Sequence, residues 1–595
     1  MDKIAVIDFG GQYAHLIANR VRRLKVFSEV LPPTVPLTDL SAYKGVIFSG
    51  GPASVYDPNQ PDFNPDIFSV QVPSLGICYG HQLLCATHKG KVVRGKVHEF
   101  GASQLRAGTA HPLFKGLQSE TRVWMSHGDE VEALPEGFRC IGSTDDCSYA
   151  AVANDETRTY GLQFHPEVTH TIEGNKVLDN FIEICGAARE WNMGFYYHIL
   201  EKRIKEQCRD KKVFLLVSGG VDSTVAFALL NRVLGPERVT GLHVDNGLMR
   251  KNESALILEY MKSQDFHNLE FCDAGRTFLE ALQGVTAPEE KRKIIGDLFP
   301  QVLDDKLDAM GADSTGWLMA QGTTYPDTIE SGGTKNAATI KTHHNRSERI
   351  MEMLEKGLIV EPLAELYKDE VRELGSSFGI PDALVWRHPF PGPGLGVRLL
   401  CSDDTDLSVD QELEKKLKTI LDTRNIDGQA YPIRSVGVQG DSRTYAHPCL
   451  IRGLNDWRVC EDVSTEITNN IRDINRVVLE IGRTSEDEYS LVKRSCDKAS
   501  LDFLREADSM CTETLIDNNL YREIWQMPVV LLPLALDGKP VIVMRPIYSA
   551  EAMTASFAEI GFHILSDLWK KLESLGVGAL WYDITHKPPG TIEWE

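Results

Sequence analysis

Short apolar runs that end at a glycine recur along the chain, and helical stretches follow them. The run over 213–217 has five apolar residues, too few for a core helix, and a Ser-Gly-Gly sequence comes next. We interpret this run as a buried parallel strand, with an apolar helix over 225–230. Runs at 4–7 and 45–48 predict the same alternation near the N-terminus. The pattern predicts an α/β fold with parallel sheets.

The chain after about residue 391 has a different order of elements, and this order occurs twice. Each copy has a charged helical stretch, two strands, a helix and a third strand. In the first copy the helical stretch is at 413–421, the strands are at 430–438, 445–452 and 474–481, and a helix comes before the last strand. In the second copy the helical stretch is at 501–515, the strands are at 526–534, 541–546 and 577–584, and the helix starts from about Phe557. We therefore expect a C-terminal α+β region with two repeated subdomains.

The length of the chain indicates how many domains it has, and its net charge makes some partners less favourable. A chain of 595 residues suggests three or four domains, and a formal net charge of −22 argues against a phosphate-backbone partner such as tRNA. The first residues lead directly into a strand, and no apolar run reaches the length of a membrane span. The twelve cysteines include no Cys-x-x-Cys pair, so most should be buried reduced thiols. We expect a cytosolic protein with neither a nucleic-acid nor a membrane partner.

The loop after the strand at 213–217 has the features of a phosphate site. Two adjacent glycines let the backbone approach an anion closely, and the first turn of the following helix points N–H groups at it. No Lys follows the glycines, so this is not a Walker loop. The bland alternative is an ordinary Gly-rich turn. The Ser-Gly-Gly-Val-Asp-Ser sequence, however, resembles the pyrophosphate loop of the ATP pyrophosphatases, a resemblance that implies ATP contacts at Ser218, Gly219, Gly220, Val221, Asp222, Ser223 and Thr224.

A second candidate site centres on Cys78. It lies in a Gly-x-Cys-x-Gly sequence where a strand meets a helix, as in a nucleophile elbow, and the positive end of the helix favours a thiolate. His165 and Glu167 lie two apart at another strand end and can project the same way, and Gly51 follows a third strand. Taken alone, His165 is more often a structural histidine and Cys78 a core thiol.

Together these pieces, with Ser126-His127-Gly128-Asp129, resemble the class I glutamine amidotransferases. The resemblance implies that Cys78 attacks the glutamine carbonyl, His165 transfers the proton and Glu167 fixes the His165 tautomer. It also implies an oxyanion site at the N–H groups of Gly51 and Tyr79 and a glutamine contact at Gln82. The product of this half would be free ammonia.

The middle of the chain holds further candidates for the ATP site. Asp245 ends the strand at 239–245, at the sheet edge where doubly wound folds bind nucleotides. Three bases in a row at 291–293 usually mark a solvated helix face. In the Lys-Thr-His-His-Asn sequence at 341–345, adjacent side chains cannot easily share a metal, so we prefer Lys341 as a phosphate contact. The Pro/Gly-rich stretch at 387–396 predicts a rigid loop. The alternative without a function is that it is only a linker.

In this order the motifs resemble the glutamine-hydrolysing GMP synthetases, up to the C-terminal Lys-Pro-Pro-Gly-Thr-Ile-Glu-Trp-Glu. The resemblance implies an amidotransferase domain at 1–188, a Rossmann-like ATP pyrophosphatase domain at 189–390, and subdomain copies at 391–485 and 486–595. It implies that xanthosine monophosphate (XMP) is the acceptor, with contacts at Arg292, Asp441, Arg443, Gln526, Lys587, Ile592 and Glu593. Shorter members have one C-terminal unit and pair through it, so two copies predict an internal pseudo-dimer in a monomer, with a homodimer as the alternative.

The chemistry that this family resemblance implies has two steps. The C2 oxygen of XMP attacks the α-phosphorus of Mg-ATP, and ammonia then displaces AMP to give GMP. Mg²⁺ would come with ATP, and Asp222 and Asp245 are candidate ligands. Two alternatives remain: another amidating pyrophosphatase, such as an NAD or asparagine synthetase, and a binding protein with degenerate sites. The intact Cys78, His165 and Glu167 argue against the second.

Overall fold

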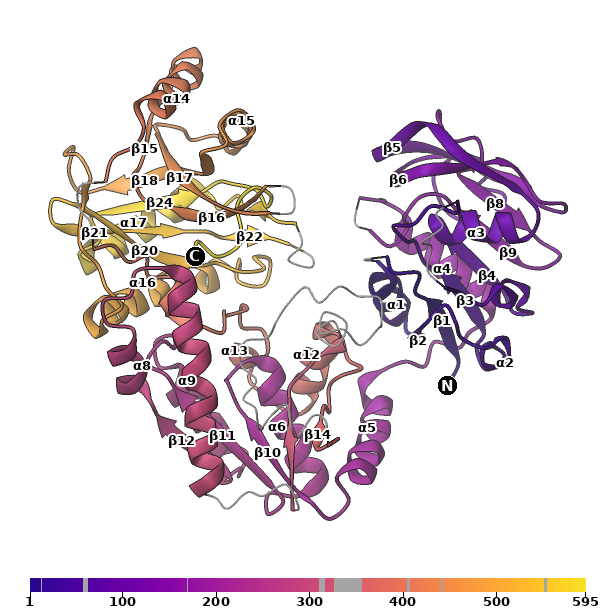
Figure 1. Ribbon diagram of the computed structural model, residues 1–595, viewed down its shortest axis with the longest axis horizontal. Helices are drawn as coiled ribbons and strands as arrows, with labels where there is room; N and C mark the ends of the chain where they lie inside the picture. The colour runs from indigo at the N-terminus through magenta and orange to yellow at the C-terminus, as the bar shows by residue number, and fades with distance from the viewer. Residues whose placement is uncertain are drawn as a thin grey trace. The chain divides into compact units, whose positions relative to one another are not determined.

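The computed structural model describes residues 1–11, 13–56, 62–168, 170–309, 316–325, 356–403, 407–439, 442–549 and 554–595 (Figure 1). The chain forms two compact units. The first contains residues 1–202 together with 324–325 and 364–370, and the second contains 203–323, 356–363 and 371–595. Among the described helices, none has the length and apolar character needed to cross a membrane.

A single mixed sheet forms the centre of the first unit, in the order β2-β1-β3-β4-β9-β8-β7-β5-β6. Its strands are β1 (Lys3–Ile7), β2 (Phe27–Leu31), β3 (Gly45–Phe48), β4 (Ser74–Ile77), β5 (Lys91–Ala107), β6 (Glu120–Ala133), β7 (Arg139–Ser143), β8 (Ala151–Asn154) and β9 (Thr159–Leu162). Strands β1 to β4 and β9 pair in parallel, as the apolar runs predict. Strands β1, β3, β4 and β9 are almost entirely buried because helices cover both faces of a parallel sheet, whereas the edge strand β2 is half-buried.

The helices of this unit each follow a parallel strand. They are α1 (Ala14–Arg23), α2 (Leu37–Leu40), α3 (Tyr79–Thr87) and α4 (Gly174–Cys185). Helix α3 follows β4 directly and is buried along most of its length. The join between β4 and α3 therefore lies at the carboxyl edge of the sheet, where α/β folds place their sites. Helix α5 (Met193–Cys208) spans the sequence boundary between the two units.

The first part of the second unit is a parallel sheet in the order β12-β11-β10-β13-β14. Its strands are β10 (Lys212–Leu216), β11 (Val239–Asp245), β12 (Leu269–Asp273), β13 (Trp317–Ala320) and β14 (Ile359–Val360), and its helices are α6 (Val221–Leu234), α7 (Glu253–Ser263), α8 (Gly275–Ala281), α9 (Pro288–Ala309), α12 (Lys368–Ser377) and α13 (Asp382–Val385). The chain order of the strands reverses between β10 and β13, which makes their carboxyl ends the topological switch point of a Rossmann-like fold. The predicted fold class is confirmed here.

The second part of this unit is a larger sheet, in the order β15-β17-β18-β24-β21-β20-β19 with β16 paired to β17 (Figure 1). The strands are β15 (Asp427–Ala430), β16 (Ser435–Gln439), β17 (Ser442–Arg452), β18 (Ile474–Arg483), β19 (Ser490–Leu491), β20 (Val529–Leu536), β21 (Lys539–Met544) and β24 (Ala579–Asp583), with a separate pair β22 (Ile547–Tyr548) and β23 (Ser556–Phe557). The helices are α14 (Gln411–Arg424), α15 (Trp457–Asn470), α16 (Lys498–Asp517) and α17 (Phe562–Leu575).

Two of the predicted elements in this region were wrong in detail. The run at 430–438 is not one strand but the end of β15 and then β16, because Pro432 between them has no N–H for the ladder. The helix expected from about Phe557 begins at Phe562 instead, since Ser556–Phe557 pairs with β22 as a short strand. The order of the remaining elements is as expected in both segments, and the duplication itself stays a prediction.

Candidate active sites

Cys78 occupies the sharp join between β4 and α3. Its φ of 52° and ψ of −110° lie in a region that residues with a Cβ rarely adopt. The flanking glycines permit close backbone packing: a Cβ at Gly80 would meet the Phe48 carbonyl oxygen at 2.3 Å, and a Cβ at Gly76 would meet the Gly80 oxygen at 2.7 Å. The strain is therefore on the cysteine itself, which places its thiol at the N-terminus of α3.

His165 and Glu167 form a buried pair beside this thiol. The Nδ1 of His165 lies 2.6 Å from Oε1 of Glu167, and both side chains are almost fully buried. Burial would lower the pKa of His165, but the charges of Glu167 and Cys78 and hydrogen bonds to both raise it well above its ordinary value. A histidine in this state can hold a proton next to a thiolate.

The other predicted glutaminase residues surround the thiol. Tyr79 is the first residue of α3, so its N–H points out of the helix N-terminus. Gly51 lies against Tyr79, and a Cβ there would meet the Tyr79 ring at 3.0 Å. Gln82 is buried and donates to the Asp129 carbonyl at 2.7 Å, so its amide supports the wall of the site.

The pyrophosphate loop lines a cavity of about 280 Å³ at the switch point between β10 and β13. Gly219 has a φ of +82°, and Ser218 and Ser223 place their hydroxyls 3.1 Å apart at the start of α6. The opposite wall contains Gln321 and Gly322 at the end of β13. Hydroxyls and a helix N-terminus on one side of the cavity are the groups that bind phosphate. Val221 and Thr224 lie in the first turn of α6, which begins at Val221.

Two carboxylates were predicted as metal ligands, and they are placed differently. Asp222 lines the cavity in the first turn of α6. Asp245 ends β11, and its oxygens accept from the Gly247 N–H at 2.9 Å and the Ser254 hydroxyl at 2.8 Å. A carboxylate oxygen suits Mg²⁺, and Asp222 is the better placed of the two. Lys341 lies outside the described residues.

The acceptor candidates meet around the C-terminal segment of the chain. The carboxylate of Glu593 accepts from Gln526 at 2.8 Å and from Arg398 at 2.9 and 3.1 Å. Residues Lys587 and Ile592 belong to the same segment, and Lys587 exchanges backbone hydrogen bonds with Ala555. Arg398 is fully buried, so its fork geometry fixes the orientation of the Glu593 carboxylate.

Helix α9 brings the basic run to the same segment. Arg292 donates to the backbone oxygen of Glu595, and Lys291 pairs with the Glu595 carboxylate. The expectation of a solvated face was wrong for Lys291, which is fully buried. Arg443 reaches Glu289 of α9 at 2.9 Å, one turn before Arg292. Asp441 lies outside the described residues.

Comparison with known proteins places these sites in one family. Three family models match the chain: Glutamine amidotransferase class-I at residues 5–185, NAD synthase at 195–288, and GMP synthase C terminal domain at 425–486 and 513–594. A Leptospira interrogans protein named "Probable GMP synthase (glutamine-hydrolyzing)" is 44% identical over 100% of this chain and 99% of its own length. The chain belongs to the glutamine-hydrolysing GMP synthase family. The family resemblance drawn from the motifs is thereby confirmed.

Members of the GMP synthase family differ in length, as a comparison with a shorter relative shows. The GMP synthase (glutamine-hydrolyzing) of Clostridium novyi is 41% identical over 80% of this chain and 96% of its own length. This chain is therefore the longer of the two. The NAD synthase match covers the pyrophosphate loop and strands β10, β11 and β12.

Several residues at these candidate sites were missed by sequence reasoning. Gln163 donates to the Cys78 sulfur at 3.8 Å, and the thiol donates to the Ser126 carbonyl at 3.4 Å. Arg387 donates to the Gly219 carbonyl and pairs with Glu253, so it supports the pyrophosphate loop from the stretch read as a linker. The one available signal was position: Gln163 lies two residues before His165, and Arg387 begins a Pro/Gly-rich motif.

One buried group of metal-type ligands lies next to the Cys78 site, since His127 contacts the same Asp129 carbonyl as Gln82. Among the described residues, the ligand atoms of Glu99, His127 and Cys147 lie within 4.8 Å of one another. The Glu99 carboxylate, however, already accepts hydrogen bonds from Ser103 at 3.1 Å and Thr144 at 3.4 Å and contacts His127 at 3.2 Å. We interpret the group as a hydrogen-bonded core of the glutaminase unit.

Replacing Glu167 by Gln should slow glutamine hydrolysis while ammonium-driven synthesis continues. The substitution removes the charge that raises the pKa of His165, so His165 should lose its proton at lower pH than in the wild type. We expect a loss of about 10²-fold in kcat, in the range that general acid–base catalysis contributes. As pH rises, glutaminase activity should fall earlier in the variant. An unchanged pH profile would contradict the assigned role.

His81 should make the glutaminase unit sensitive to acid. Its ring is fully buried behind Cys78 on α3, and burial lowers its pKa from 6.5 to about 3. Below pH 6.5 the unfolded chain takes up a proton at this residue and the folded chain does not, so stability falls with pH. Between pH 7 and 5 the loss from this residue should be about 2 kcal/mol.

The measurement for His81 is the midpoint of thermal unfolding against pH. His81→Gln should flatten the dependence between pH 7 and 5, while His198→Gln, at a residue whose side chain is 76% exposed, should keep the wild-type slope. Parallel curves for wild type and His81→Gln would refute the assignment.

Proposed function

We propose that the chain makes GMP from XMP in two half-reactions at separate sites. It is a carbon–nitrogen ligase that takes its nitrogen from glutamine, as family membership requires. The observation that carries the proposal is the strained Cys78 beside the His165–Glu167 pair, in the same chain as a pyrophosphate loop at a topological switch point. One site releases ammonia, and the other activates its acceptor.

In the glutaminase half, Cys78 is the nucleophile. Its thiolate attacks the side-chain carbonyl of glutamine while the N–H groups of Tyr79 and Gly51 hold the developing oxyanion. His165, kept protonated by Glu167, gives its proton to the departing ammonia. Water then attacks the thioester carbonyl, with His165 as base, and glutamate leaves. The carbonyl of Ser126 and the amide of Gln163 fix the position of the sulfur.

In the synthetase half, the loop from Ser218 to Thr224 holds the β- and γ-phosphates of ATP. Its hydroxyls and the N–H groups of α6 neutralise the charge of the departing pyrophosphate. Mg²⁺ would supply further charge neutralisation on the phosphates, with Asp222 as its candidate protein ligand. The α-phosphorus is left exposed to the C2 oxygen of XMP. We also assign Lys341 to the phosphates.

The acceptor is held by the C-terminal segment. We assign Arg292, Arg443 and Lys587 to the phosphate of XMP because cations suit a dianion, and Asp441, Gln526 and Glu593 to polar groups of the xanthine and ribose. Arg398 orients the Glu593 carboxylate for this contact. The backbone at Ile592 completes the contact surface.

The remaining proposals concern organisation. We propose the domain boundaries at 188, 390 and 485, a cytosolic location, and a monomer whose two C-terminal copies pair within the chain. The mirrored strand order and the two matched segments of the C-terminal family model support the last point. Light scattering over a range of concentrations tests it, and a stable dimer at every concentration would refute it.

The experiment that tests the reaction uses XMP labelled with ¹⁸O at the C2 oxygen. If this oxygen attacks ATP, the label should appear in the phosphate of AMP when GMP forms. Label released into water, with unlabelled AMP, would rule out adenylation of the acceptor.

A further inference from the structure

The C-terminal sheet has an internal symmetry at the junction of its two copies. Strands β18 and β24 pair in antiparallel fashion, and the register joins residues 478, 479 and 480 to 583, 582 and 581. Exchanging 478 with 581 and 480 with 583 reproduces the same pairs, so a pseudo-twofold axis passes through Leu479 and Tyr582. The outer strands follow the same correspondence, because Ile451 pairs with Leu479 in one copy and Met544 with Tyr582 in the other.

One ion pair is repeated in both copies. Arg452 and Arg545 each come directly after the equivalent residues Ile451 and Met544. Arg452 pairs with Glu480 at 3.4 Å, and Arg545 pairs with Asp583, the equivalent of Glu480, at 2.8 Å. The pair in the first copy is partly exposed, whereas both members in the second are fully buried.

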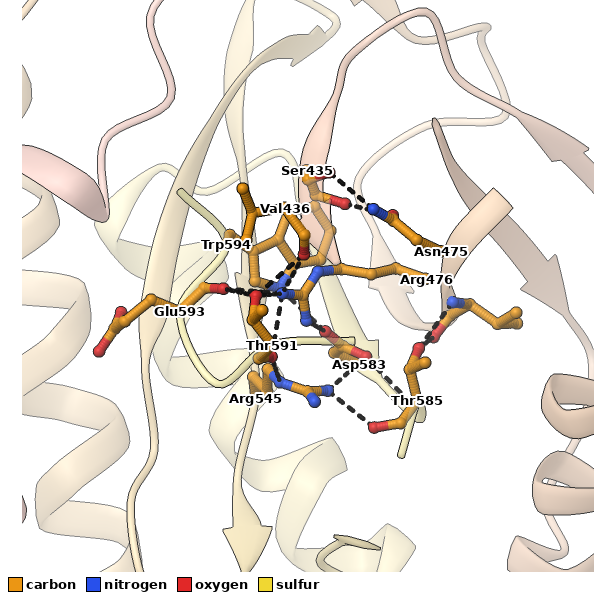
Figure 2. A network of polar contacts seen from close by, with 11 residues as sticks. Ser435, Val436, Asn475, Arg476, Arg545, Asp583, Thr585, Thr591, Glu593 and Trp594 are labelled. Atoms are coloured by element: carbon orange, nitrogen blue, oxygen red, sulfur yellow. Dashed lines mark hydrogen bonds and ion pairs between the residues drawn. The ribbon is translucent and has the colours of Figure 1, made fainter. Parts of the chain in front are cut away.

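Each pair has a second guanidinium, but its origin differs: Glu480 has Arg483 of its own copy at 3.7 Å, whereas Asp583 has an arginine of the other copy. Arg476 of β18 crosses the axis and places Nη1 2.8 Å from Oδ2 of Asp583 (Figure 2). The symmetry-equivalent residue of β24 is Ala579, which has no charge to offer Glu480. The first copy therefore supplies a guanidinium to the second, and the second returns none.

The same guanidinium holds the C-terminal segment. Its Nη2 donates to the carbonyls of Val436, Thr591 and Glu593 at 3.0, 3.0 and 2.7 Å and to the Thr591 hydroxyl at 2.8 Å (Figure 2). Arg545 donates to the Thr591 carbonyl at 2.9 Å, and the Trp594 indole donates to Asp583 at 2.9 Å. The C-terminal segment also lies along strand β16 of the first copy. The backbone N–H groups of Val436 and Val438 donate to the carbonyls of Trp594 and Pro589.

The buried positive charge of Arg476 requires the C-terminal segment to be in its place. Two guanidinium groups and one carboxylate leave a net positive charge in a fully buried position. Burial lowers the pKa of Arg476 to about 9, so the group is still charged at neutral pH. The carbonyls of 591 and 593 are the groups that compensate it, and a displaced segment would leave a buried cation without acceptors.

We propose that Arg476 is a positioning residue for XMP, acting from the first copy through segment 586–595 of the second. The inference rests on the proposed role of Lys587, Ile592 and Glu593 in acceptor binding. Arg476 sets the backbone of Thr591 and Glu593 and does not touch XMP itself. Only a planar fork can reach Asp583 and these carbonyls together, so Lys cannot replace it.

The test compares Arg476→Lys and Arg476→Met with Arg472→Met, which removes an exposed arginine four residues earlier. The Michaelis constant for XMP is measured with ammonium as donor, alongside that for ATP, and amide hydrogen exchange is followed in 586–595. For Arg476→Lys we expect KM for XMP to rise tenfold or more, KM for ATP to change less than twofold, and exchange in the segment to accelerate. Arg472→Met should match the wild type in all three measurements.

Two results would overturn the proposal. In Arg476→Lys, wild-type protection of 586–595 would show that Arg476 does not hold the segment, and faster exchange with an unchanged KM for XMP would show that the segment's position does not matter for the acceptor. Thermal unfolding identifies a variant that fails to fold. If Arg476→Met does not fold, Arg476→Lys, which keeps the positive charge, still provides the test. If the wild type made no GMP from XMP, the proposed function would fail, while the exchange comparison would still decide the structural step.

Discussion

Cys78→Ala should abolish GMP formation from glutamine and leave the ammonium-driven reaction intact. The sulfur is the one atom at the β4–α3 join that can form the thioester, and Ala keeps the turn without it. Loss of a nucleophile of this kind costs about 10⁴-fold or more in kcat. Because ammonium needs only the adenylated acceptor, its kcat should stay within twofold of the wild type. Initial rates with XMP, Mg-ATP and either donor measure both arms.

Other results for Cys78→Ala would contradict the assignment of the two half-reactions to separate sites. If Cys78→Ala lost both reactions while unfolding normally, ammonia production and amination would share residues, and the two-site scheme would be wrong. If it lost neither, another residue would be the nucleophile. Cys78→Ser is a useful second variant, since it places a hydroxyl oxygen where the sulfur was. This oxygen is a far weaker nucleophile unless it is deprotonated.

Gly219→Ala should have the second largest effect, on adenylation. Gly219 has a φ of +82°, and a Cβ there would meet the buried Ile257 side chain at 2.2 Å. A left-handed residue with a Cβ costs about 1–2 kcal/mol before any clash. The loop must therefore move, which displaces the N–H groups and hydroxyls that surround the phosphates. We expect kcat/KM for ATP to fall by about 10²-fold, while glutamine hydrolysis without ATP keeps its wild-type rate.

Gly453→Ala is the matched control for this prediction. Gly453 has a φ of +77°, but a Cβ there would have no neighbour within 4 Å. The two variants thus share the backbone strain and differ in the contact and in the place. Equal losses of ATP-dependent activity would mean that strain lowers general stability, and the assignment of the 218–224 loop would lose its support.

Sequence reasoning predicted the sharp turn at Cys78 and the glycine turn before α6 because both depend on local chain geometry. A glycine on each side of Cys78 and a Gly-Gly pair before α6 are visible as neighbouring letters, and the apolar strands before them are equally plain. The same reasoning misjudged Lys291. Three adjacent bases look like a solvated face, but Lys291 is buried by the carbonyls of Gly396 and Leu399 and by Glu595, up to 304 residues away.

Long-range partners explain the other misses as well. Arg398 lies 195 residues before Glu593, and Arg387 lies 168 residues after Gly219. Neither position has a local pattern that distinguishes a buried, bidentate arginine from one on a surface loop. The boundary of β16 was predicted wrongly for a different reason, since one proline within the run at 430–438 interrupts the strand. Contacts across the sheet were needed to find these residues.

The pairing of β18 with β24 inside one chain also affects how this part of the molecule can change in evolution. In a symmetric homodimer every substitution appears on both sides of the axis, so a residue useful at one site must be tolerated at its mirror position. Here the two halves are encoded separately, and a mutation alters one without the other. Ala579 opposite the position of Arg476 is an example. Each half of such a chain can therefore acquire its own residues for one shared site, without a copy of them at the mirror position.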